Sequence, residues 1–102
     1  MVVKPTIRLY RNDGIKQNSY IYNMPKVLAH KGFIFYFYSD EGTEPVHVHI
    51  KKAEGRAKWW LEPAIEEEYA YGFTLQERRK IKRLIIQNQD YLKEKWYEYF
   101  QR

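Results

Sequence analysis

Apolar and polar residues alternate along the middle of the chain with the period of a β-strand. In Val46–Lys52 the valine and isoleucine positions point one way, and the histidine positions point the other. Ala57–Leu61 alternates in the same manner, and the turn signal around Gly55 predicts an antiparallel hairpin between the two stretches. Phe33–Tyr38 is apolar on both faces and rich in aromatic residues, so it predicts a central strand.

The last third of the chain has the period of a helix. Thr74 and Glu77 match a capping box, in which each side chain accepts a hydrogen bond from the backbone of the other. A single stripe then recurs every three or four positions: Ile81, Leu84, Ile85, Asn88, Leu92, Trp96 and Tyr99. We expect a break at Gln87–Asp90, with Asp90 capping a second helix, because one straight helix would overhang a domain of this size.

These elements predict a single α+β domain, in which a small antiparallel β-sheet of three to four strands carries a C-terminal helical segment on one face. The helical stripe should pack on the apolar side of the hairpin, at Val46, Val48, Ile50 and Trp59. Val27–Ala29 could add a short strand, and Ala64–Tyr71 fits a strand and a helical turn equally well. The domain spans residues 24–102, and residues 1–23 are an N-terminal extension or arm.

Composition narrows the classes of function. The 102 residues include no cysteine, which excludes disulfides, a thiolate nucleophile and cysteine-ligated metal sites. No apolar run could span a bilayer or form the core of a signal peptide, so we expect a cytoplasmic protein without a membrane partner. The net charge of +5 is uneven, because basic segments at residues 1–32 and 74–102 flank an acidic middle. The basic segments indicate RNA or DNA as a candidate partner.

His47 and His49 share the polar face of the Val46–Lys52 strand, about 7 Å apart. This face points away from the helices, and we expect it to be the more accessible one. Imidazole titrates near neutral pH, so the strand concentrates the acid–base chemistry of the chain. The hairpin should place charged and aromatic side chains beside the two histidines: Lys51, Arg56, Lys58, Trp60 and Glu62.

Three interpretations of this pair stay open. In the first, His47 and His49 are the acid–base pair of a cofactor-free ribonuclease, in which Lys51, Arg56 and Lys58 stabilise phosphate charge. In the second, they bind the ion of a metal-dependent hydrolase, with a third ligand from one of four residues: Glu62, Asp40, Glu44 or His30. In the third, they lie under the helices and order a polar layer. No cofactor is required, and a metal at His47 and His49 is not excluded.

A basic cluster marks the helical segment. Arg79, Lys82 and Arg83 fall on its outer face when Ile81 points to the core. Such a face can lie along a phosphate backbone, or it can be a solvated surface. Trp60 could likewise stack on a base or cover the sheet. We expect the glutamates at residues 66–68 to pair with arginines of the same chain.

An ordered set of short motifs resembles a small bacterial family known as a domain of unknown function, number 4160 in its series. The motifs extend over residues 24–102: Met24–Leu28, Gly32-Phe33 before an aromatic strand, Glu44–His49, Ala57–Pro63, Gly72–Glu77 and Trp96–Phe100. The family name implies no activity. Its members resemble components of two-gene cassettes, which implies a protein partner from an adjacent gene and a toxin–antitoxin-like role.

We therefore expect an interaction or regulatory component of such a cassette. A ribonuclease and a metal-dependent hydrolase are the alternatives, and assembly into a homo-oligomer stays open. The resemblance supports the histidine strand as a signature of the family, but it assigns no reaction to it.

Overall fold

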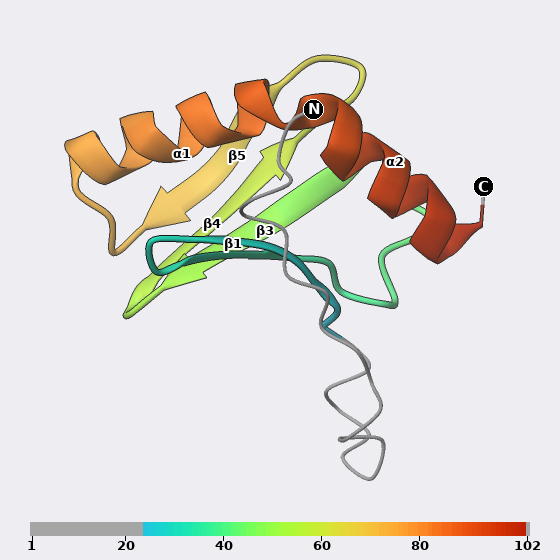
Figure 1. The fold of residues 1–102 in the computed structure, drawn as a ribbon, viewed down its shortest axis with the longest axis horizontal. Coiled ribbons are helices and arrows are strands. Elements are labelled where there is room, and N and C mark those ends of the chain that lie inside the picture. The colour runs from blue at the N-terminus through green and yellow to red at the C-terminus, as the bar shows by residue number, and fades with distance from the viewer. Residues whose placement is uncertain (1–23, 102) are drawn as a thin grey trace, which may run out of the picture.

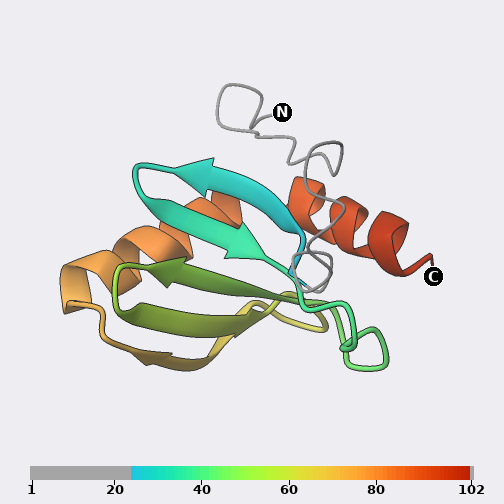
Figure 2. The ribbon, with the colours of Figure 1, turned by 90° about the horizontal axis from the view of Figure 1, so that it is seen from below.

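A computed structural model describes residues 24–101, which form a five-stranded antiparallel sheet with two helices on one face (Figure 1, Figure 2). The strands lie side by side in sequence order: β1 (Lys26–His30), β2 (Phe33–Tyr36), β3 (His47–Lys52), β4 (Gly55–Trp60) and β5 (Glu66–Tyr71). The helices follow them: α1 (Leu75–Gln87) and α2 (Gln89–Phe100). The predicted arm at residues 1–23 lies outside the described residues.

The predicted α+β class is confirmed, and the sheet has one strand more than expected. The added edge is β5, which lies in the segment that fitted a strand and a helical turn equally well. It forms a strand because its backbone pairs with β4. The expected pairing of the glutamates is also present, since Glu67 on β5 forms an ion pair with Arg78 on α1.

The register of the β3–β4 hairpin sets which side chains are neighbours. His47 lies opposite Trp60, and His49 lies opposite Lys58. Directly opposed residues of an antiparallel pair point to the same side of the sheet, so both pairs lie on the face without helices. Val48, between the two histidines, is fully buried on the helix side. The alternation of the sequence therefore predicted both faces of the hairpin correctly.

The two helices begin and end close to the predicted positions. The Thr74 hydroxyl accepts a hydrogen bond from the Glu77 N–H (3.0 Å), and the Glu77 carboxylate accepts one from the Thr74 N–H (2.9 Å). The break lies at Asn88, whose side chain donates to the carbonyl oxygen of Leu84 (2.7 Å). Asp90 lies in the first turn of α2 and is not its N-cap, because the second helix has its N-cap at Asn88 and so begins two residues earlier than expected.

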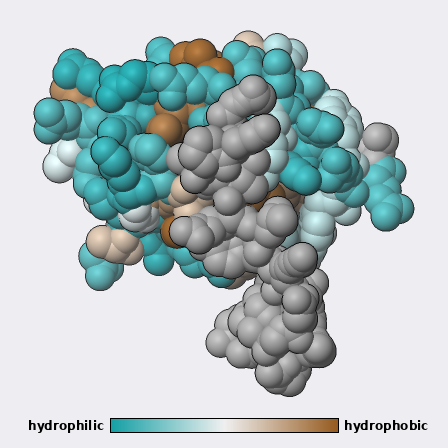
Figure 3. All heavy atoms as spheres, viewed as in Figure 1, coloured by the Kyte–Doolittle hydropathy of each residue, from teal (hydrophilic) through white to brown (hydrophobic). Residues whose placement is uncertain are grey.

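The core lies between the sheet and the helices, where the predicted stripe is buried except for Tyr99, which is 39% exposed. The core includes Phe35, Val48, Ile50, Ile81, Ile85, Leu92 and Trp96. Burial of each large side chain contributes about 1.5–3 kcal/mol. The outer surface over α1 is mostly hydrophilic, as expected when the apolar stripe points inward (Figure 3). Among residues 24–101, no helix has the length and apolar character needed to cross a bilayer.

Candidate metal centre

His47 and His49 project from β3 onto the helix-free face of the sheet. They are nevertheless buried, with exposed fractions of 1% and 3%, so the expectation of an accessible pair is wrong. Large rings cover them. Tyr36 stacks on the ring of His49 and Tyr38 contacts its edge, at centroid distances of 5.5 and 4.6 Å. Trp60 contacts the ring of His47 at 5.5 Å. A placement under the helices is equally wrong, because the helices lie on the other face.

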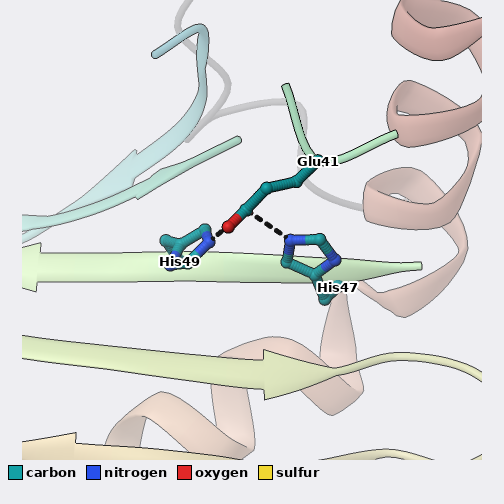
Figure 4. Close-up of side chains that lie close together, drawn as sticks. All are labelled: Glu41, His47 and His49. Atoms are coloured by element: carbon teal, nitrogen blue, oxygen red, sulfur yellow. Dashed lines mark hydrogen bonds and ion pairs between the residues drawn. The ribbon is translucent and has the colours of Figure 1, made fainter. Parts of the chain in front are cut away.

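Glu41 covers the two histidines from the loop that joins β2 to β3 (Figure 4). Its Oε1 atom lies 2.7 Å from Nε2 of His47 and 2.7 Å from Nε2 of His49. The two imidazole rings are nearly perpendicular, at 84°, with centroids 5.2 Å apart. The side chain of Glu41 is 22% exposed, so it is the member of the group that solvent reaches most readily.

The hydrogen bonds of His47 fix the direction of its lone pair. Nδ1 lies 2.8 Å from the backbone carbonyl oxygen of Pro45, which can only accept, so Nδ1 carries a proton. In the neutral ring Nε2 then has a lone pair that faces the carboxylate oxygen of Glu41. Two lone pairs at 2.7 Å repel each other. The arrangement is therefore stable only with a positive charge between the two atoms, as a second proton or as a metal cation.

Burial and ion pairing have opposite effects on the pKa values of Glu41 and His49. Burial lowers the pKa of His49, because desolvation penalises the imidazolium form, and the nearby Glu41 only partly offsets that effect. Burial would raise the pKa of Glu41, but hydrogen bonds and electrostatic attraction to the two histidines together outweigh it and leave that pKa lowered. A neutral imidazole and an ionised carboxylate are the forms that coordinate metal ions.

The loop that carries Glu41 is positioned by the end of α2. The Glu41 N–H donates to the carbonyl oxygen of Tyr38 (3.2 Å), which closes a turn. The next residue, Gly42, lies so close to the ring of Phe100 that a Cβ there would be 2.5 Å from it. Phe100 in turn packs on Trp96, with ring centroids 4.6 Å apart. The aromatic C-terminal motif of the chain therefore supports the loop over the histidines.

Glu41, His47 and His49 each offer one ligand atom, and these atoms lie within 4.8 Å of one another. Two imidazole nitrogens and a carboxylate oxygen are a donor set that zinc and other divalent transition metals accept. The hydrogen bond from Nδ1 of His47 to a backbone carbonyl is the outer contact that metal-binding histidines usually make. We call these three residues the metal-binding group.

The metal-binding group contains none of the third ligands suggested by the sequence: Glu62, Asp40, Glu44 and His30. Glu44 forms an ion pair with Lys58 at 2.8 Å. Glu62 lies beyond the end of β4, where strand alternation no longer directs its side chain, and it accepts a hydrogen bond from Tyr97 (2.6 Å). Glu41 was missed because a loop has no periodicity from which to orient its side chains. Its one signal is that it precedes His47 by six residues.

The predicted basic residues are divided between the two faces of the sheet. Lys51 and Arg56 are paired in register at the turn end of the hairpin, away from the metal-binding group. Lys58 lies over the ring of Trp60 at 4.5 Å, beside the histidines. The remaining three are exposed on α1, as predicted, and lie on the other side of the sheet: Arg79, Lys82 and Arg83.

The family model "Domain of unknown function (DUF4160)" matches residues 32–97. This span contains the strands β2 to β5, α1 and the whole metal-binding group. The chain matches no curated protein and no solved structure. Because the match covers well over half of the chain and the site as well, the chain belongs to the DUF4160 family of domains of unknown function.

Proposed function

We propose that this protein is a metal-dependent hydrolase whose ion is held by Glu41, His47 and His49. The observation that carries the proposal is the convergence of two Nε2 atoms on one carboxylate oxygen, at 2.7 Å each. Nδ1 of His47 carries a proton, so in the neutral ring the Nε2 lone pair points at that oxygen. A divalent cation among the three donors would take the place of a second proton and satisfy their lone pairs.

The distances suit an ion after a small adjustment. A tetrahedral ion with bonds of about 2.0–2.1 Å separates its ligand atoms by about 3.3 Å. The two N···O distances of 2.7 Å must therefore lengthen by about 0.6 Å. Glu41 can supply this movement because it lies on a loop. The three ligand atoms lie within 4.8 Å of one another, so rotation of the imidazole rings on β3 has to bring the two nitrogens to about 3.3 Å.

Three protein ligands leave the fourth position of a tetrahedral ion for water. A zinc ion held by the metal-binding group would lower the pKa of that water to about 7 and so would supply hydroxide as a nucleophile. Lys58 lies opposite His49 in the register, where a cation can hold an anionic substrate oxygen. The reaction class that fits this combination is hydrolysis of a phosphodiester.

A cofactor-free ribonuclease fits the geometry less well. Its two imidazoles would have to serve as acid and base toward the two sides of a phosphate, each within reach of the substrate. Here both Nε2 atoms meet the same oxygen of Glu41, and both rings are buried. The regulatory role with the product of an adjacent gene stays a prediction, and so does the cytoplasmic location. A metal site is compatible with both and is evidence for neither.

Metal binding by the purified chain tests the proposal first. Chelator-treated protein should bind Zn²⁺ or Mn²⁺ in a one-to-one ratio by calorimetry. Glu41→Gln and His49→Gln should each weaken binding by about tenfold or more, because each removes a ligand. Asp40→Asn is the matched control. It neutralises an exposed carboxylate of the same loop that is not in the metal-binding group, so it should leave the affinity unchanged.

Hydrolysis of bis(p-nitrophenyl) phosphate by the same proteins tests the reaction. Activity should require added metal, persist in Asp40→Asn and disappear in Glu41→Gln. Folded wild-type protein that binds no divalent ion would refute the proposal. One-to-one binding without any hydrolysis would refute the enzyme and leave a structural metal centre in its place.

A further inference from the structure

The helix-free face of the sheet presents two exposed aromatic rings at its β5 edge. Tyr69 and Tyr71 have exposed fractions of 41% and 62%. Their rings are stacked, with centroids 5.9 Å apart and an angle of 18° between planes. Rings of this size are usually turned toward a core, and two adjacent exposed ones form a flat apolar platform.

Cationic side chains lie directly beside this platform. In the β4–β5 register Tyr71 is opposite Arg56, and Tyr69 is opposite Lys58. In the β3–β4 register Arg56 is opposite Lys51. Opposed residues share a face at about 5 Å, so Lys51, Arg56 and Tyr71 form a row across three strands. We call these three residues the cross-strand row.

The two cations of the row have no acidic partner among residues 24–101. The Arg56 guanidinium donates only to the carbonyl oxygens of Ala53 and Gly55. Lys51 lies directly opposite Arg56 in the register, so the two cations repel each other. A bound anion would relieve that repulsion, because the local potential is positive.

We propose that the cross-strand row binds single-stranded nucleic acid, with a base stacked on Tyr71 and backbone phosphates on Arg56 and Lys51. Proteins that bind single strands combine cations along the backbone with aromatic rings on which bases stack. Rings that lie on an open sheet suit splayed bases, which a duplex does not offer. An acidic peptide would use the cations but would have no need of the paired rings.

If the cross-strand row binds single-stranded nucleic acid, then single-stranded nucleic acid is the substrate class of the proposed hydrolase. This assignment of the substrate rests on the proposed function. Lys51 and His47 are four positions apart on β3, which is about 13 Å along a strand. A strand of nucleic acid that leaves the cross-strand row along β3 therefore reaches the metal-binding group within a few nucleotides. Binding itself does not need the metal, so the two proposals fail separately.

Fluorescence anisotropy with the full chain, in the presence of a chelator, tests the binding. The probes are a labelled RNA of about ten nucleotides, the DNA of the same sequence, and the corresponding duplex. The single strands should bind, and the duplex should bind at least tenfold more weakly. Tyr71→Ala should weaken binding by about fivefold to a hundredfold, the effect of removing one base–aromatic stack, while Tyr71→Phe should retain it.

Salt titrations test the phosphate contacts. The double variant Lys51→Gln/Arg56→Gln should reduce the slope of log affinity against log salt by about 1.4, since two phosphate contacts are lost. Arg79→Gln/Lys82→Gln is the matched control, because it removes the same charge from the α1 surface on the other side of the sheet. It should leave both the affinity and the slope unchanged.

Three results would overturn the proposal: unchanged affinity in Tyr71→Ala, equal effects of the two double variants, or equal binding of the duplex. Displacement of the RNA by an equal concentration of polyglutamate would overturn it as well. If the protein binds RNA but does not cleave it after metal is added, the proposed hydrolase activity is refuted and the proposed nucleic-acid-binding surface is retained. Hydrolysis of the small phosphodiester by protein that binds neither strand refutes the surface alone.

Discussion

Gly42→Ala tests directly whether α2 positions the ligand loop. A Cβ at residue 42 would lie 2.5 Å from Cδ1 and 3.1 Å from Cε1 of Phe100. Carbon atoms prefer separations of about 3.5–4.0 Å, so the loop or the ring must move by about 1 Å. The backbone of Gly42 is outside the left-handed region, so alanine adds no conformational strain of its own. The steric contact alone is therefore responsible for any effect.

The loop should move in preference to the ring. Phe100 is held by three other rings, with centroids 4.6, 4.9 and 6.2 Å away: Trp96, Tyr99 and Phe37. A shift of about 1 Å in Glu41 exceeds the tolerance of about 0.2 Å for a metal–ligand bond. Metal affinity should then fall by about 10–100-fold. Overpacking should also lower the free energy of unfolding by about 1–3 kcal/mol.

Zinc titration by calorimetry and urea unfolding measure the two effects separately. Phe100→Ala alone is the control for the loss of the ring. The double variant Gly42→Ala/Phe100→Ala should recover affinity, because alanine lacks the Cγ, Cδ1 and Cε1 atoms that the new Cβ meets. Wild-type metal affinity in a folded Gly42→Ala protein would show that Glu41 is positioned independently of α2.

Three further predictions concern stability and assembly. Leu92→Ala should lower the free energy of unfolding by about 2–5 kcal/mol in urea, since Leu92 is fully buried, and a loss below about 1 kcal/mol would contradict the packing of α2. The pKa of Glu77 is lowered, first by the Thr74 N–H and then by Lys52. The ionised Glu77 carboxylate therefore stabilises the folded protein at pH values above the pKa of an unfolded glutamate. This contribution is lost as the pH falls through the lowered pKa. Glu77→Gln should therefore be less stable than wild type at neutral pH and equal to it in acid; a gap that persists in acid would contradict this. The product of the adjacent gene should stay with the tagged chain through gel filtration, and separate elution would refute the expected partner.

The positions of some residues in the site could be predicted from the sequence and those of others could not, for a physical reason. His47 and His49 lie on a strand, where the alternation of side chains fixes their face from the sequence alone. Their burial could not be predicted in this way, because it depends on how the rings of Tyr36, Tyr38 and Trp60 close over them. The solvent exposure of a side chain depends on neighbouring residues that are distant along the chain.

The size of the domain indicated the break near Asn88, whereas local spacing by itself determined the hairpin, the capping box at Thr74 and the buried stripe. These features depend on residues only a few positions apart, so the sequence contains the information directly. Only the tertiary structure decided that Glu41 meets both histidines, because a loop has no repeating direction and its course depends on the contact of Gly42 with Phe100. The metal-binding group exists because chain segments that are separate in sequence converge there.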